Sequence, residues 1–174
     1  HQPPGVWEEI FKGRFTYDPS PGSARYRRTL YTFWRRSSAP TFLFDSSARL
    51  VCEVGIRRTN TPLHALTRLN DVTLLEASQR LAFQALATHS LQVDHLNYLS
   101  RATLSRSLSD QEIDIYQREL ETFHAHYQNH QRDAMELLTV GQTVANGDEG
   151  LADLAALTLV ANMMYNLDEA VTHE

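Results

Sequence analysis

Polar side chains suited to binding carboxylates or other anions gather in a short run from Arg58 to Thr61, just before an apolar stretch. A second run, Asn166 to Glu169, supplies an amide and two carboxylates. A carboxylate beside a core is tolerated when an arginine pairs with it. We therefore predict that both runs meet a third, arginine-containing segment in one buried or half-buried polar network. Its predicted members are Arg27, Arg28, Arg58, Asn60, Thr61, Asn166, Asp168 and Glu169.

Asp168 and Glu169 also raise the question of acid–base catalysis, because pairs of carboxylates cleave glycosidic bonds. Adjacent residues on a helix point about 100° apart, so these two would not flank one substrate from opposite sides. Pairing with Arg28 and Arg58 is the preferred interpretation. An acid–base role on polysaccharide stays open as the alternative.

Asn162 and Asn166 lie four residues apart in an apolar segment, so both amides are expected on one face of a helix. A buried amide without hydrogen-bond partners costs roughly 1 to 3 kcal/mol. We predict that the run from Arg58 to Thr61 supplies those partners.

Histidines and the single cysteine are the residues that could bind a metal or act as a nucleophile. His126 and His130 have the i, i+4 spacing that places two imidazoles on one metal ion, but His124 points about 200° away from His126 and no third ligand is evident. Cys52 alone excludes an internal disulfide, a cysteine-rich zinc site and covalent attachment of haem c. We expect it to be a buried thiol, with a nucleophile assisted by His64 as the alternative. We predict no metal and no cofactor in this chain.

Arginines and aromatic residues alternate between Arg27 and Arg36, where Tyr31, Phe33 and Trp34 lie. Such a segment can stack on sugar rings or bases while its arginines hold anionic groups. The aromatic spacing also fits the apolar face of a docked helix, which we prefer. A carbohydrate-binding surface stays open as a second alternative.

The composition limits what kind of protein carries these residues. A chain of 174 residues with 42% hydrophobic content is large enough for one domain with a core. The net charge of −5 argues against a general nucleic-acid partner. No run of 18 apolar residues predicts a membrane span, and nothing reads as a signal peptide, so any export signal is expected outside this chain.

We expect a single domain or fragment over residues 1–174, with a loop-rich wrap over 1–47 and a helical bundle over 48–174. Five of the six prolines precede residue 48. Only two helices are expected in the wrap, over 6–11 and 25–36.

Helix-start signals recur from residue 61 onward. Thr61 with Pro62 and then Asp71 are good N-caps, and Ser109 to Glu112 forms a capping box. Gly141 is expected to end a helix in a left-handed conformation. The apolar last helix should run through the middle of the bundle. The predicted fold class is therefore all-α, an irregular helical bundle. After a short helix that starts at Pro62, the expected helices run to 88 from the Asp71 cap, then over 92–106, 109–129, 133–140 and 151–171.

Four segments carry a resemblance to a known family: Gln2–Glu9, Tyr26–Arg36, Arg58–Asp71 and Asn166–Glu169. In order and spacing they resemble the C-terminal domain of unknown function in large secreted planctomycete proteins that carry cytochrome c-like modules. The chain resembles the C-terminal portion of that domain. It departs from the family pattern at Gly55, His64 and Val72, where arginine, glutamine and proline are expected.

The resemblance implies an all-helical fold, an extracytoplasmic location and haem c in a neighbouring module, with no activity assigned. We therefore expect a non-catalytic structural or interaction module of a larger exported haem-containing protein. Its expected partners are other domains of the same polypeptide, with polysaccharide as a further candidate. The alternatives are part of an active site that acts on polysaccharide by oxidation or hydrolysis, and a carbohydrate-binding surface.

Overall fold

The computed structural model describes residues 61–141 and 150–171, and every regular element in these ranges is an α-helix. The predicted all-α fold class is confirmed. None of the described helices is long and apolar enough to cross a bilayer. The chain divides into two compact units, His1–Thr67 and Arg68–Glu174. The single domain and its wrap over 1–47 stay predictions, and the helices expected over 6–11 and 25–36 lie outside the described residues.

The first described helix, α2 (Pro62–Leu69), begins where the sequence predicts. The hydroxyl of Thr61 accepts a hydrogen bond from the backbone N–H of His64 at 3.3 Å. Proline lacks a backbone N–H, but at the first helical position no intrahelical hydrogen bond is lost, because the first N–H groups of a helix have no partner within the helix. The end of α2, Arg68 and Leu69, belongs to the second unit.

The next two helices pack against each other in the second unit. Asp71 caps α3 (Val72–Thr88), and its carboxylate accepts from the N–H groups of Thr73 and Leu74 at 2.9 and 3.0 Å. α4 (Gln92–Leu104) ends two residues earlier than predicted, because Ser105 adopts a left-handed conformation with φ 59°.

A sharp corner joins the following pair of helices. α5 (Asp110–Asn129) begins with the predicted capping box, and α6 (Gln131–Leu138) follows directly after His130. α6 ends at Leu138, before the predicted end at Val140, and the chain then turns at Gly141 with φ 93°, the predicted left-handed conformation. A methyl group on Gly141 would collide with the buried side chain of Glu76 on α3, so both backbone conformation and space require glycine there.

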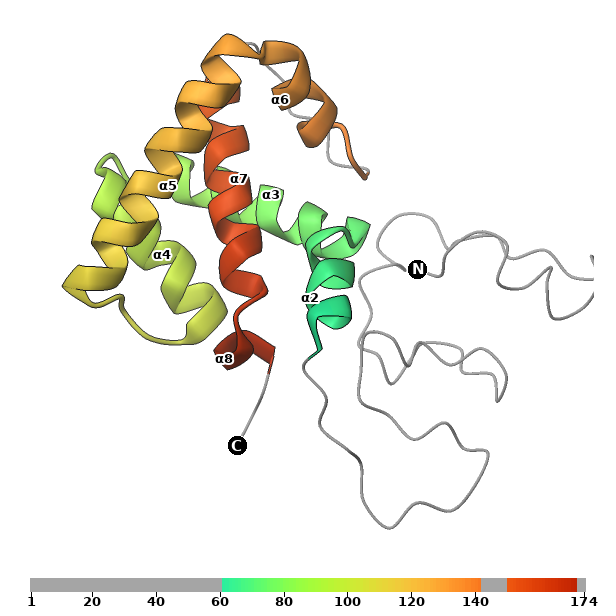
Figure 1. The fold of residues 1–174 in the computed structure, drawn as a ribbon. Coiled ribbons are helices and arrows are strands. Elements are labelled where there is room, and N and C mark those ends of the chain that lie inside the picture. Colours follow the sequence, from blue (N-terminus) through green and yellow to red (C-terminus); the bar gives the residue numbers. More distant parts are fainter. Residues whose placement is uncertain (1–60, 142–149, 172–174) are drawn as a thin grey trace, which may run out of the picture. The chain divides into compact units, whose positions relative to one another are not determined.

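α7 (Leu151–Tyr165) lies in the middle of the second unit, as its apolar surface predicts (Figure 1). It packs against α3, α4, α5 and α6, and α8 (Asp168–Val171) follows it. Most of its residues are withdrawn from water, including polar ones. The buried residues of α7 are Ala155, Ala156, Leu157, Thr158, Val160, Ala161, Asn162 and Met164.

The predicted single helix over 151–171 is wrong. α7 stops at Tyr165, the chain turns at Asn166 and Leu167, and α8 follows as a separate single turn. Neither proline nor glycine occurs at the break, so helical periodicity alone could not reveal it.

The buried face of α3 carries polar as well as apolar residues. Glu76, Ser78 and Gln79 are all buried among its leucines and alanines. The Gln79 side-chain amide donates to the backbone carbonyls of Leu137 and Val140 at 2.9 and 3.3 Å. These bonds tie α3 to the end of α6, which gives a buried polar group a structural role.

Candidate functional site

The turn between α4 and α5 carries a connected cluster of polar side chains. Ser105 reverses the chain after α4, and Ser100 donates its hydroxyl proton to the backbone carbonyl of Arg106 at 2.7 Å. The side chain of Asn97 accepts from the N–H of Leu108 at 3.3 Å. α4 therefore fixes both ends of a short loop, and this loop presents Arg106 beside the start of α5.

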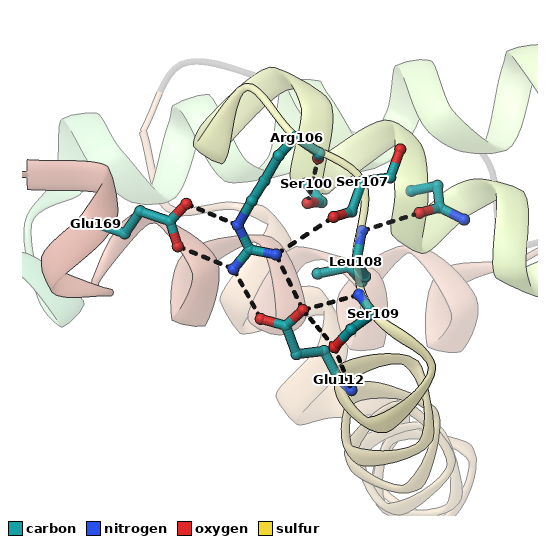
Figure 2. A network of polar contacts seen from close by, with 8 residues as sticks. Ser100, Arg106, Ser107, Leu108, Ser109, Glu112 and Glu169 are labelled. Carbon is teal, nitrogen blue, oxygen red and sulfur yellow. Dashed lines mark hydrogen bonds and ion pairs between the residues drawn. The ribbon is translucent and has the colours of Figure 1, made fainter.

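Arg106 is bound on two edges of its guanidinium group, as Figure 2 shows. Its Nε and Nη2 donate to the two carboxylate oxygens of Glu169 on α8 at 2.7 and 2.9 Å. Its Nη1 and Nη2 donate to the two oxygens of Glu112 on α5 at 2.9 and 2.7 Å. Both pairs are bidentate, the geometry in which arginine binds carboxylates most strongly. We call Arg106, Glu112 and Glu169 the Arg106 clamp.

Glu112 has a second role, because it is also the acidic residue of the α5 capping box. Its Oε2 accepts from the backbone N–H and from the hydroxyl of Ser109, each at 2.8 Å. In return, the Ser109 hydroxyl accepts from the N–H of Glu112 at 3.4 Å. One carboxylate thus joins the cap of α5 to the Arg106 clamp (Figure 2).

The clamp holds its carboxylates in the ionised form. Hydrogen bonds from Arg106, and then from Ser109, lower the pKa of Glu112 from 4.5 to about 2. The hydrogen bond from Arg106 also lowers the pKa of Glu169, and both carboxylates raise the pKa of Arg106. The side chains remain partly accessible, with exposed fractions of 38% for Arg106, 32% for Glu112 and 46% for Glu169. Water therefore screens these pairs, and each contributes less than a buried pair would.

A second polar contact joins α7 to the end of α2. Asn162 donates its amide to the carbonyl of Leu69 at 3.1 Å, and Asn166 accepts from Nε of Arg68 at 3.1 Å. Arg68 and Asn162 are both buried. The side-chain oxygen of Asn162 is buried and has no hydrogen-bond partner among the described residues. The described partners of the asparagines therefore lie at the end of α2, whereas the predicted partners, Arg58 to Thr61, precede its start.

The predicted network is only partly described. Arg27, Arg28, Arg58 and Asn60 lie outside the described residues, so a meeting of the three segments stays a prediction. Thr61 caps α2, and Asp168 lies in the first turn of α8. Asn166 and Glu169 bind different cations, Arg68 and Arg106 respectively.

Sequence reasoning missed Arg106 as a partner. It placed Arg106 at the end of a long helix over 92–106, and it assigned Glu112 to the capping box alone. In this chain the arginine three residues before the capping-box serine binds the box glutamate, so the local sequence holds both partners of that pair. The partner on α8, Glu169, lies 63 residues away in sequence, so that pair has no local signal.

Of the three histidines considered as metal ligands, His124 and His126 lie on α5 and His130 follows its last residue. His124 lies 3.0 Å from the carboxylate of Asp153 on α7, and Nε2 of His126 lies 3.5 Å from that of Asp133. The rings of His126 and His130 stack with centroids 4.5 Å apart. Within residues 61–141 and 150–171, no three or more histidine, cysteine, aspartate or glutamate residues are arranged to hold a metal ion.

Aromatic side chains do not form an exposed strip on the described part of the chain. Tyr116 and Tyr127 are buried in the core, and Phe83 is the one exposed phenylalanine or tyrosine of this part. The guanidinium of Arg80 lies 5.6 Å from the centre of the Phe83 ring. The arginine-rich aromatic segment over 27–36 lies outside the described residues.

Comparison with known proteins gives one family match. The model of PSD1, a protein of unknown function (DUF1553), matches residues 2–120, which is more than half of the chain. The matched segment includes Arg106 and Glu112 but ends before α7 and Glu169. No curated protein and no solved structure matches the chain.

Proposed function

We propose that this chain, which belongs to the PSD1 (DUF1553) family of unknown function, is a non-catalytic structural or interaction module of a larger exported haem-containing protein. The observation that carries the proposal is the Arg106 clamp. Its two carboxylates bind the same guanidinium group through both of their oxygens. Through these contacts, the residue after α4 is joined to α5 and to α8. This arrangement supports a role in holding the fold together.

The electrostatics of Glu169 supports a structural role over an acid–base one. A general acid for glycosidic cleavage needs a raised pKa, so that it carries a proton near neutral pH. Arg106 instead lowers the pKa of Glu169. A residue in this state matches an ion-pair partner, and no described contact favours the polysaccharide-cleaving or carbohydrate-binding alternatives.

The wider context of the proposal comes from the resemblance of the four sequence segments. It includes an extracytoplasmic location, other domains of the same polypeptide as partners, and haem c in a neighbouring module, with no cofactor in this chain. The family match over residues 2–120 supports the resemblance to a domain of unknown function, and the planctomycete and cytochrome c context is part of the proposal.

A binding experiment separates the structural role from its alternatives. Wild type, Arg106→Ala and the control Arg132→Ala are titrated calorimetrically with a panel of soluble neutral and sulfated polysaccharides. Arg132 is a fair control because it forms an exposed ion pair with Glu136 within α6. We expect no binding heat for any variant and a lower melting temperature for Arg106→Ala alone. Saturable binding by wild type that Arg106→Ala abolishes would replace the structural proposal with a carbohydrate site.

The cellular context needs the full-length polypeptide. Cells that express it are fractionated, and the protein is located by antibody and by the absorbance of haem c. We expect the protein in the extracytoplasmic fraction with haem c bound. Recovery from the cytoplasm without haem would contradict this context and leave the structural role of the Arg106 clamp standing.

A further inference from the structure

We propose that α3 and α4, which lie in the family-matched segment, and α7, which lies beyond it, fold as one cooperative unit. The match covers residues 2–120, whereas α7 begins at Leu151. Three observations carry the inference: the match ends inside a helix, one apolar core spans its end, and buried polar side chains bond across its end. None of them depends on the proposed cellular context.

The end of the family match falls inside α5. This helix runs from Asp110 to Asn129, and the match ends at residue 120. Tyr127, which lies beyond the match, is as deeply buried as Leu120, with 7% of each residue exposed. A helix propagates through consecutive hydrogen bonds, and boundaries between folding units fall in exposed connecting segments. The end of the match is therefore not the end of a folding unit.

One apolar core joins the helices on the two sides of this boundary. α7 packs against α3, α4 and α5, and α3 packs against α4. α7 is apolar on all sides, and such a helix is stable in water only when other helices cover it. Loss of α7 would in turn expose the surfaces of α3 and α5 that pack against it. The fully buried members of this core are Ala82 and Ala85 on α3, Leu96 and Leu99 on α4, and Ala155, Ala156, Val160, Ala161 and Met164 on α7.

Buried polar side chains also bond across the boundary. Gln79 on α3 is 3% exposed, and its amide donates to the carbonyls of Leu137 and Val140, which lie beyond the match. Asn162 on α7 is 4% exposed, and its amide donates to the carbonyl of Leu69 inside the match. A buried polar group that loses its partner destabilises the fold. Each side of the boundary therefore satisfies hydrogen bonds of the other.

Native-state hydrogen exchange of the full chain tests the cooperative unit at single residues. Exchange rates are measured by nuclear magnetic resonance for the amides of Ala82 and Ala85 in α3 and of Ala156 and Ala161 in α7. Leu157 on α7 is 1% exposed, so Leu157→Ala leaves a cavity beyond the match. We expect this variant to accelerate exchange in both helices by the same factor, on the order of 100. The reason is that their buried amides open only when the whole unit unfolds.

Three further variants complete the experiment. Leu91→Ala makes the same truncation at a leucine that is 66% exposed, and it should change the rates less than about threefold. Val160→Ala leaves a smaller cavity in α7 and replaces Leu157→Ala if that variant does not fold. The reciprocal variant Leu99→Ala, on α4 inside the match, should accelerate the amides of α7 as much as those of α3.

Either of two results would overturn the proposal. Acceleration confined to α7 in Leu157→Ala or Val160→Ala would show that the matched helices keep their fold without it. Acceleration in Leu99→Ala that stops short of α7 would show that α7 belongs to a separate folding unit.

Discussion

Arg106 links three elements because its planar guanidinium group can bind two carboxylates at once. A lysine at this position would keep the charge but lose the two parallel pairs of hydrogen bonds. Glu112 accepts hydrogen bonds from both Arg106 and Ser109. These bonds stabilise its ionised form and so lower its pKa. Charge pairing and helix capping therefore depend on one side chain.

The pKa of Glu112 gives a prediction for stability against pH. A carboxylate whose pKa falls from 4.5 in the unfolded chain to about 2 in the fold stabilises the protein above pH 4.5. That stabilisation is lost as the pH falls from 4.5 to 2. Glu112→Gln keeps an oxygen that can complete the capping box and removes the charge. We expect it to cost about 1 kcal/mol at pH 7, after screening by water.

Urea unfolding at a series of pH values checks this prediction. The difference in unfolding free energy between wild type and Glu112→Gln should be constant from pH 7 to about pH 5 and should vanish toward pH 2. A difference that does not change with pH would mean that the ion pair contributes nothing and that only the shape of residue 112 matters.

At the scale of the elements, start signals were more reliable than end signals. Thr61, Asp71 and Ser109 each cap the helix that the sequence predicts, because a capping side chain bonds to N–H groups two or three residues away. The ends of α4, α6 and α7 were placed too late, and α6 also begins at Gln131, before the predicted start at Asp133. The break after α7 lies beside long-range contacts from Arg68 and Arg106, whose partners no local pattern encodes.

The turn after α4 gives the prediction for an element. Ser105 is the one non-glycine residue with positive φ among those described, at 59°. A side chain in this conformation costs roughly 1 to 2 kcal/mol, while glycine adds about 0.4 to 1 kcal/mol of entropy to the unfolded chain. We therefore expect Ser105→Gly to stabilise the protein by about 0.5 kcal/mol in urea unfolding.

Ser90, in the turn between α3 and α4, supplies the matched control because it is exposed and lacks positive φ. Ser90→Gly should destabilise by about 0.5 kcal/mol, since only the entropy of the unfolded chain changes. Equal losses in the two variants would show that the conformation of Ser105 carries no strain.

At the scale of the whole molecule, periodicity predicted the helical class and the central position of α7. Its run of apolar residues has no polar face, and such a helix must be covered by others. Polar pairing could not be predicted in the same way. Gln79 binds carbonyls about 60 residues away, and Asn162 binds the carbonyl of Leu69. A polar residue in an apolar helix shows that a partner is needed, but the fold decides which one it is.

We propose that the Arg106 clamp is structural and that its Arg106–Glu112 pair holds the end of α4 against the start of α5. A double-mutant cycle of Arg106→Ala and Glu112→Gln, measured by urea unfolding at pH 7 and low salt, tests this. We expect each single variant to be less stable than wild type and the double variant to lose less than the sum, with a coupling energy of about 1 kcal/mol. Additive losses, with coupling below about 0.3 kcal/mol, would contradict the claim.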